Sequence, residues 1–349
     1  MSPRTEVDGR RWPTMKDVAK RAGVSVSTVS YVLNDSGPVA PDRRARILDA
    51  VKVLKYTPNE SARNLKRRSA STIGLVVPDL ANPFFALLAE GVERAAAARD
   101  VLVVLCAPEA TGGDESLNGR LLRSQRLDGI IYLSGTTTSA SSMLELTRLG
   151  PVVLVDEQLP GLELPCIVSD NRRGARELAT YVLSQGHRKI TVIGGPKQLW
   201  TGEQRLAGYR EAVAAAGLDP DALPVLIGDY HQSSGSELAA QALAGHRSTW
   251  PTVLLCANDL MAVGVLEQCK LLGVRVPQDL SVVGFDDLPF SSLLTPRLTT
   301  VRQPAREMGE RAAHVLFDVL EGRGDIALGA PFPVSVQVRD SVAAPRDSA

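Results

Sequence analysis

The chain has 349 residues, which is too long for one small core and indicates two or three folding units. Hydrophobic residues make up 44% and charged residues 22%, the proportions of a globular protein, and no apolar run is long enough to span a bilayer. The net charge is zero, but residues 1–70 hold 15 Lys and Arg against 7 Asp and Glu, and the remainder holds 24 against 32. A basic head on an acidic body fits a phosphate-binding module joined to a sensor; a chance cluster of solvated charges is the alternative.

The N-terminal residues and the cysteines indicate in which cellular compartment the protein is expected. Residues 1–13 lack the apolar segment of a signal peptide, so we expect a cytoplasmic protein with no membrane partner. They are predicted to form a flexible tail, although three arginines in it are also placed to touch phosphates. The four cysteines are widely spaced and form no CxxC pair, which favours buried free thiols over disulfides or a metal site.

Residues 14–34, TMKDVAKRAGVSVSTVSYVLN, predict two short helices around a tight turn. Thr14 and Asp17 form a capping box at the first helix, and Gly23 supplies the turn because it has no Cβ. The apolar residues at helical spacing are expected to face inward: Val18, Ala19, Ala22, Val29, Val32 and Leu33. This leaves Val26, Ser27 and Tyr31 on the outside of the second helix. Such a unit places its second helix in the major groove of DNA, although a plain helical hairpin has the same pattern.

A third helix is predicted at about 41–54, with Ile47, Ala50, Val51 and Leu54 on its buried side, and it would close a three-helix head over residues 14–58. Residues 59–70 are mostly polar. They form either a plain linker or a helix, and such a helix is too short to be stable by itself in water.

The string KDVAKRAGVSVSTVSYVLN resembles the headpiece of the lactose-repressor/galactose-repressor family, which carries xDVAxxAGVSxxTVSxxxN. The similarity continues through YTPN at 56–59, ARNL at 62–65 and most of the remaining chain. The resemblance implies a DNA-binding transcriptional regulator, most often a repressor, that binds a palindromic operator as a homodimer. It also implies that residues 59–70 form a hinge helix that orders on DNA, with Leu65 in the position of a leucine inserted between the central base pairs.

The residues expected to contact double-stranded DNA fall into three groups. Val26, Ser27 and Tyr31 are the candidates for contacts to base edges. Family members often carry a basic residue or histidine at the position of Tyr31, so this tyrosine predicts an altered operator preference. The candidates for phosphate contacts are Thr28, Asn34 and Tyr56, and the hinge candidates are Ala62 and Leu65.

From residue 71 short β-rich runs alternate with helical stretches, which predicts an α/β fold with parallel sheets covered by helices. Strands are expected at 73–77, 101–106, 130–133, 152–155, 190–193, 253–256, 280–285, 298–301 and 334–338. The alternation occurs twice, so we expect two lobes with a cleft between them. Lobe one is predicted at about 71–168 and 298–328, and lobe two at about 169–297 and 329–345. This pattern resembles the periplasmic-binding-protein fold that the family uses as its sensor.

Ligands in such sheets bind beyond the carboxyl ends of the strands. The residues there include a PDxxNPFF signature of the family and the position of its ligand-binding arginine. The predicted ligand-binding residues are Asp79, Asn82, Phe84, Asp156, Glu157, Asp170, Trp200, Thr201, Arg205, Tyr230, Asn258, Asp259 and Asp286. Acids, amides and one arginine beside aromatic rings suit a polyol, so a sugar or nucleoside effector is expected and no cofactor.

Several of these residues also have a structural interpretation. Phe84 or Phe85 fits the helix core, and Phe85 is the better fit. Asp259 fits a helix cap, Arg205 fits a surface ion pair, and Asp287 is expected to be structural. No metal site is predicted.

Motifs for phosphate loops, dinucleotide binding, hydrolase elbows and zinc proteases are absent, and the four histidines are scattered, so an enzyme is not expected. The alternative is a sugar-binding protein of the periplasmic type with no DNA role. The basic head and the lack of a signal peptide argue against it. The chain ends without a leucine heptad, which favours a dimer over a tetramer.

Replacing Leu65 tests the implied hinge. We expect Leu65→Ala to weaken specific operator binding far more than non-specific binding, because an inserted side chain contributes only where the duplex is kinked. Titrations of operator and random-sequence DNA at one salt concentration measure both affinities. Equal losses on the two DNAs would contradict the assignment.

Overall fold

The computed structural model describes residues 13–33, 36–56, 72–106, 127–133, 140–159, 161–323 and 329–345. The chain divides into a head, residues 1–69, and a body, residues 70–349. The predictions for the N-terminal tail, for Asn34 and for the hinge with Ala62 and Leu65 lie outside the described residues.

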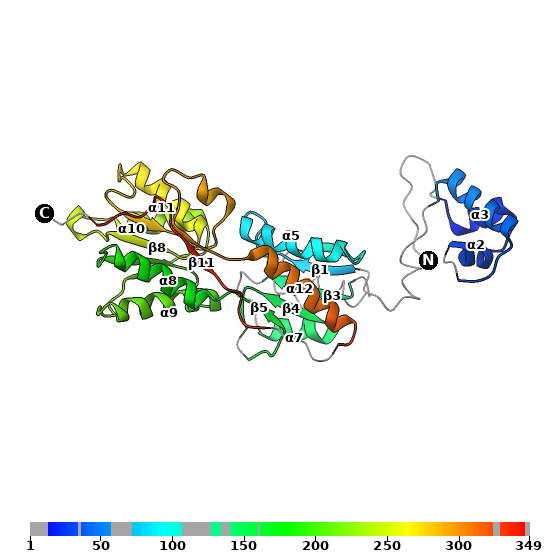
Figure 1. Cartoon of the computed structure of the whole chain (residues 1–349), viewed down its shortest axis with the longest axis horizontal. Coiled ribbons are helices and arrows are strands. Elements are labelled where there is room, and N and C mark those ends of the chain that lie inside the picture. Colours follow the sequence, from blue (N-terminus) through cyan, green and yellow to red (C-terminus); the bar gives the residue numbers. More distant parts are fainter. Residues whose placement is uncertain are drawn as a thin grey trace. The chain divides into compact units, whose positions relative to one another are not determined.

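The head contains the three predicted helices: α1 (Met15–Ala22), α2 (Val26–Leu33) and α3 (Pro41–Leu54) (Figure 1). The expected capping box begins α1, where the Thr14 amide donates to Asp17 Oδ2 at 2.7 Å. Gly23 ends α1 with φ +64°, the left-handed region that glycine enters without steric cost. The chain can therefore reverse at once into α2, and the helix–turn–helix is confirmed.

A small apolar core holds the three helices together. It consists of Val18, Ala19, Ala22, Val29, Val32, Ile47, Ala50 and Tyr56. Val18, Val29 and Ile47, one from each helix, are fully buried. Eight-residue helices are not stable alone in water, so this packing is what keeps α1 and α2 folded.

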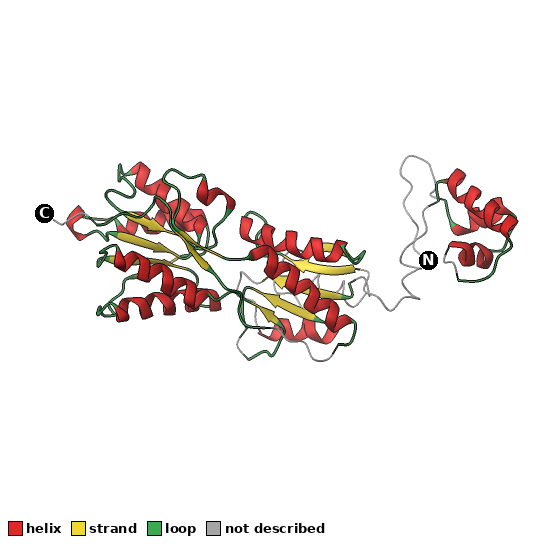
Figure 2. Cartoon of the chain, viewed as in Figure 1, coloured by secondary structure: helices red, strands yellow, loops and turns green. Residues whose placement is uncertain are grey.

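Lobe one of the body is built on a sheet covered by helices (Figure 2). The sheet is parallel, with the strand order β2-β1-β3-β4-β5. Its strands are β1 (Thr72–Val76), β2 (Leu102–Cys106), β3 (Gly129–Leu133), β4 (Val152–Val155) and β5 (Cys166–Ile167). One face packs against α5 (Pro83–Ala97) and α12 (Ala305–Leu320), and the other against α7 (Ala140–Leu149). Both faces are covered, so the strands read as nearly continuous apolar runs.

Lobe two repeats this architecture with the strand order β7-β6-β8-β9, also parallel. Its strands are β6 (Ile190–Gly194), β7 (Val225–Ile227), β8 (Val253–Cys256) and β9 (Ser281–Val283). The helices α8 (Asn171–Ser184) and α9 (Trp200–Ala215) cover one face, and α10 (Gln232–Ala242) and α11 (Asp259–Leu271) cover the other. Two 3₁₀ turns, η1 (Arg247–Thr249) and η2 (Pro289–Ser292), lie in its loops.

The chain passes between the lobes three times (Figure 1). It enters lobe two between β5 and α8, returns to lobe one between β10 (Thr300–Arg302) and α12, and comes back before β11 (Ser335–Gln337). The strands β10 and β11 pair antiparallel beside lobe two. The predicted α/β architecture with two lobes is confirmed. Beyond the sequence prediction, the structure adds the strands β5 and β7 and the helices α10 and α12.

The described residues contain free thiols, but no membrane-spanning helix and no group of metal-ligating side chains. All four cysteines are free thiols, and three of them are buried. Within the residues that the structure describes, no helix combines the length and the apolar character needed to cross a membrane. In the same residues, no three His, Cys, Asp or Glu side chains are grouped to hold a metal ion.

Some helices pack with their backbones in direct contact. In lobe one, α5 lies along α12, and a Cβ placed on Gly91 would be 2.0 Å from the carbonyl oxygen of Arg306. A Cβ on Gly309 would meet the carbonyl oxygen of Leu88 at the same distance. Neither backbone atom can move aside as a flexible side chain could. The equivalent glycines in the helix pairs of lobe two are Gly208, Gly235 and Gly264.

This contact predicts a large stability effect from one methyl group. Gly91→Ala should lower the free energy of unfolding of the body by about 2 kcal/mol or more, because an overpacked helix interface must separate. Thermal or urea denaturation of the full chain measures it. Glu93→Ala, at an exposed position of the same helix, is the control and should stay within about 0.5 kcal/mol of the parent. An unchanged midpoint for Gly91→Ala would show that α5 and α12 are not in backbone contact.

Candidate functional site

The outer face of α2 carries the side chains predicted to read DNA. Val26 and Tyr31 are 40% and 47% exposed, and Ser27 is also exposed. Thr28 is half-buried, and its amide donates to Ser25 Oγ at 3.1 Å. Tyr56 differs, since its ring packs in the core of the head and only 9% of the residue is exposed. Any contact of Tyr56 with phosphate is therefore limited to its exposed edge.

The surface of the head is rich in cations. Its exposed basic residues within 13–56 are Lys16, Lys20, Arg21, Arg43, Arg44, Arg46, Lys52 and Lys55. They give the exposed helix α2 a surrounding field that attracts polyanions. The arrangement suits a module that binds phosphates and presents one helix to base edges.

A cavity of about 230 Å³ lies between the two lobes, at the carboxyl ends of their strands. It is lined by Pro78, Asp79, Asn82, Phe84, Phe85, Asp156, Glu157, Thr201, Arg205, Asp229, Tyr230, His231, Asn258 and Asp286. Ten of the thirteen predicted ligand-binding residues are brought together here. The exceptions are Asp170, Trp200 and Asp259. Phe84 and Phe85 both line the cavity and both belong to the core of lobe one.

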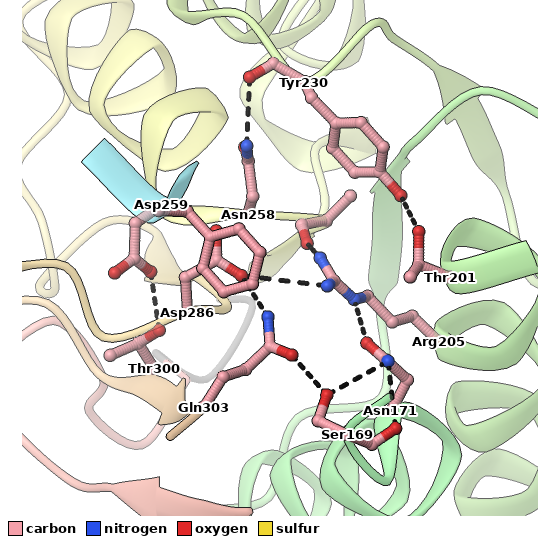
Figure 3. Close-up of polar contacts among 12 residues, drawn as sticks. Ser169, Asn171, Thr201, Arg205, Tyr230, Asn258, Asp259, Asp286, Thr300 and Gln303 are labelled. Atoms are coloured by element: carbon pink, nitrogen blue, oxygen red, sulfur yellow. Dashed lines mark hydrogen bonds and ion pairs between the residues drawn. The ribbon is translucent and has the colours of Figure 1, made fainter. Parts of the chain in front are cut away.

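Arg205 is the central polar group of the cavity wall and is 4% exposed (Figure 3). Its Nε donates to Asn171 Oδ1 at 2.7 Å, and one terminal nitrogen donates to the carbonyl oxygen of Ala257 at 2.5 Å. The other terminal nitrogen lies 3.7 Å from Asp286 Oδ1. The guanidinium also stacks on Phe285, with its carbon 4.0 Å from the ring centre. The sequence-based alternative of a surface ion pair is wrong, because Arg205 is buried.

A chain of amide and hydroxyl groups continues this network toward the segments that connect the lobes (Figure 3). Gln303 Nε2 donates to Asp286 Oδ1 at 2.7 Å, and Gln303 Oε1 accepts from the Ser169 hydroxyl. Asn171 Nδ2 in turn donates to Ser169 Oγ at 3.2 Å. Ser169 and Gln303 lie on two different crossings, so the network links the cavity to both. Neither residue was predicted from the sequence, because each acts only through partners far away in the chain.

Asp259 points away from the cavity and is fully buried (Figure 3). Its carboxylate accepts from the Leu288 amide at 2.8 Å and from the hydroxyls of Ser291 and Thr300, each at 2.5 Å. The expected ligand role is therefore replaced by a structural one. Asp259 is not the cap of α11 either. Asn258 caps this helix, because its Oδ1 accepts from the Met261 amide at 2.9 Å.

Asp170 and Trp200, the other two predicted residues that do not line the cavity, have structural contacts elsewhere. Asp170 caps α8, where its Oδ1 accepts from the Arg173 amide at 3.1 Å. Trp200 begins α9 but lines a separate cavity beside β5. Asp287 was expected to be structural and pairs with Arg302 at 2.7 Å and with Arg339 at 2.5 Å.

Three residues of the cavity have an unusual backbone conformation. Asp156, Tyr230 and Asp286 have φ values of +75°, +72° and +119°. Side-chain-bearing residues rarely occupy positive φ, and such strain gathers where a site fixes the direction of a side chain. All three come shortly after a strand and all three line the cavity, so the unusual backbone conformation coincides with the site.

Burial changes the protonation of the neighbouring acids Asp156 and Glu157. Burial raises the pKa of Asp156 to about 6, opposed by the charge of Arg205. Burial, with the nearby charge of Asp156, raises the pKa of Glu157 to about 8. Glu157 also accepts hydrogen bonds across the cleft from Thr201, from its amide at 3.1 Å and from its hydroxyl. Burial raises the pKa of Asp286 well above its usual range, and the charge of Arg205 opposes this change.

A second contact between the lobes lies at the rim of the cavity. His231 Nε2 is 3.6 Å from Asp79 Oδ2, and His231 Nδ1 is 3.3 Å from Asp229 Oδ1. Asp229 and His231 were not predicted as site residues. The only sequence signal for them is their position after β7, a strand that the sequence analysis did not identify.

Comparisons with known proteins agree with these two sites. Residues 14–59 match the family described as bacterial regulatory proteins, lacI family, and residues 179–342 match the periplasmic binding protein-like domain. The HTH-type transcriptional repressor CytR of Escherichia coli (strain K12) is 35% identical over 310 residues, which are 89% of this chain and 90% of that protein. The chain belongs to the lacI family of bacterial regulatory proteins.

Further relatives of this lacI-family protein are repressors by name. The ribose operon repressor of Escherichia coli (strain K12) is 38% identical over 309 residues, 87% of this chain and 92% of that protein. A crystal structure of the lac repressor dimer bound to operator and the anti-inducer ONPF superimposes with a TM-score of 0.82 at 27% identity. It covers 96% of this chain and all of that chain. The match includes head and body, so a sugar-binding protein without a DNA role is not favoured.

The cross-lobe acid Glu157 makes the stability of this lacI-family protein depend on pH. A carboxyl whose pKa is raised in the folded state binds a proton more tightly there than in the unfolded chain. Its contribution to stability is therefore complete below the ordinary pKa of 4.5 and is lost as pH rises through about 8. Each tenfold difference in proton affinity between the folded and the unfolded chain corresponds to about 1.4 kcal/mol, so the effect is measurable.

We expect Glu157→Gln to remove much of this dependence. The melting temperature of the parent should fall between pH 5 and pH 9 by more than that of Glu157→Gln. Calorimetry at both pH values measures the difference, and Glu163→Gln, at an exposed site, is the control and should follow the parent. Parallel pH curves for the parent and Glu157→Gln would show that Glu157 is not held protonated.

Proposed function

We propose that this protein is a transcriptional repressor that binds double-stranded operator DNA as a homodimer and is controlled by a small-molecule effector, a sugar or nucleoside. The observation that carries the proposal is the helix α2, which leaves Val26, Ser27 and Tyr31 exposed on a cationic head. A cavity suited to a small polar ligand accompanies it in the same chain.

The head supplies two kinds of contact to DNA. The exposed lysines and arginines offset phosphate charge, which gives affinity without reading sequence. Val26, Ser27 and Tyr31 read base edges in the major groove, and Thr28 with Asn34 fixes the register on the backbone. A tyrosine reads either through one hydroxyl hydrogen bond or by packing on a thymine methyl group. Tyr56, Ala62 and Leu65 complete the proposed DNA-binding set.

The body supplies the control. The proposed ligand contacts are the ten predicted residues that line the cavity, and lobe one and lobe two both contribute to them. An effector changes DNA affinity only through its different affinity for two lobe arrangements. Induction and co-repression both follow from this principle.

The proposed organisation of the chain has four parts. Residues 1–13 form a tail, residues 14–58 the head, residues 59–70 the hinge helix, and residues 71–345 the receptor that also dimerises. Two heads would then meet the two half-sites of a palindromic operator. A dimer of the lac repressor on its operator, a structural relative of this chain, supports this assembly.

The proposed repressor has no catalytic activity and acts in the cytoplasm, where its DNA lies. The relatives named above are transcriptional repressors, which supports both points.

Selection of bound sequences from random DNA tests the proposal. We expect the full chain to select a palindromic site with an affinity that falls steeply as salt rises, since phosphate contacts release counterions. Tyr31→Ala should relax the preference at one symmetric pair of positions, worth about 1–3 kcal/mol per base pair. Val53→Ala is a control of similar exposure on α3, 51% against 47%, and should leave the selected site unchanged.

Two outcomes would count against the proposal. Retention of no DNA at low salt would overturn the repressor function altogether. A selected site that is identical for the parent and Tyr31→Ala would remove Tyr31 from the base-reading set while leaving the function standing.

A further inference from the structure

The inference concerns which effectors the proposed cavity accepts, and it rests on the proposed function of that site. The acids outnumber the bases in the lining. Five carboxylates line it (Asp79, Asp156, Glu157, Asp229 and Asp286), against one arginine and one histidine. Glu157, whose pKa is raised to about 8, is mostly neutral at pH 7, and burial also raises the pKa of Asp286, so the repulsion of an anion comes chiefly from Asp79, Asp156 and Asp229. An acidic cluster alone does not define a ligand.

Asp156 supplies the second observation. It is 7% exposed, it lines the cavity, and its Oδ1 has no hydrogen-bond partner within the part of the chain that the structure describes. A buried acceptor without a donor costs free energy, and the cost is recovered when a ligand brings an O–H or N–H group to it. The group that best complements this part of the cavity is therefore a donor.

Both basic side chains of the cavity already have acids of the protein beside them. Arg205 uses its three nitrogens on Asn171, the Ala257 carbonyl oxygen and Asp286. His231 lies between two carboxylates, those of Asp79 and Asp229. Arg205 keeps further N–H groups, but a phosphate that reached them would also lie beside Asp286, and one at His231 would lie beside Asp79 and Asp229. A planar fork of donors with no acid beside it, the usual partner of a phosphate, is therefore missing from the described lining of the cavity.

Helix N-termini, the other common anion sites, are capped by side chains of the protein at this cavity. Amides at the start of a helix bind phosphate only when they are free. Here Asn82 Oδ1 accepts from the Phe84 amide of α5 at 3.0 Å, and Glu157 Oε2 accepts from the Thr201 amide of α9 at 3.1 Å. Asn258 Oδ1 accepts in the same way at the start of α11, at 2.9 Å. At each of these three helix starts, a side-chain oxygen of the protein thus already takes one of the amides that a phosphate would use.

We propose that the cavity selects a small ligand that is rich in O–H or N–H donors and carries no phosphate or carboxylate, and that it rejects the phosphorylated form of the same molecule. The volume of about 230 Å³ lies below the usual range of about 300–1,000 Å³ for small-molecule pockets. The ligand is therefore of the size of a monosaccharide or nucleoside and smaller than an oligosaccharide.

Matched pairs of compounds test the proposal on the full chain. The pairs are ribose with ribose 5-phosphate, glucose with glucose 6-phosphate, cytidine with its 5′-monophosphate, and adenosine with its 5′-monophosphate. Thermal shift finds the binders and calorimetry measures their affinities. We expect binding from an unphosphorylated compound, with its phosphorylated partner weaker by about tenfold or more. The sugar and nucleoside arms identify which donor-rich class is bound.

Variants test whether the carboxylates cause the selection. Asp156→Asn keeps the shape of the side chain and removes its charge, so the affinity ratio within a pair should fall by about threefold or more. Asp79→Asn, at the rim of the cavity, should also lower the affinity ratio within a pair. It replaces Asp156→Asn as the test variant if Asp156→Asn does not fold. Asp340→Asn removes a charge from the exposed ion pair with Arg297 and is the control, with an unchanged ratio.

Three results would overturn the inference. They are a phosphorylated compound that binds as tightly as its partner, a panel in which nothing binds, and a ratio that is the same in the parent and both cavity variants. Operator binding is measured on the same preparations without compounds. Intact DNA binding beside a failed cavity test refutes only this inference, whereas lost DNA binding refutes the proposed function.

Discussion

The buried charge of Arg205 is the constraint on which the cavity depends. A guanidinium removed from water costs several kcal/mol unless its donors are satisfied. Its partners come from three separate places, the start of α8, the end of β8 and the segment after β9. Satisfying one cation therefore fixes three strand and helix ends against each other. The same Asp286 that faces Arg205 also holds Gln303, which carries the constraint to a crossing between the lobes.

The two lobes meet through polar contacts that bracket the cavity. Glu157 of lobe one accepts hydrogen bonds from Thr201 of lobe two, and Asp79 of lobe one lies beside His231 of lobe two. Both contacts depend on a particular separation of the lobes. A ligand that contacts both sides has a different affinity for a closed and an open arrangement, and this difference is the free energy available for control.

The sequence predicted the parts of the molecule that local rules determine. The capping box and Gly23 define the turn of the head by themselves, and strands of a parallel sheet end on the same side, which is why ten predicted residues meet in one cavity. The sequence did not show where a side chain points after its strand or helix begins. Asp259 turns to Ser291 and Thr300, more than thirty residues away, and Trp200 lines a separate cavity. The strand β5 has two residues and β7 is half-exposed, so neither gives a clear apolar run.

The glycine contacts between paired helices have a consequence for how a signal travels through the body. Where Gly91 and Gly309 bring α5 and α12 together, no side chain separates the helices, so sliding one along the other would drive backbone atoms into collision. Sliding of one helix along the other is therefore disfavoured within each of these pairs. A conformational change at the cavity would then be transmitted through the three connecting segments and through the facing surfaces of the two lobes.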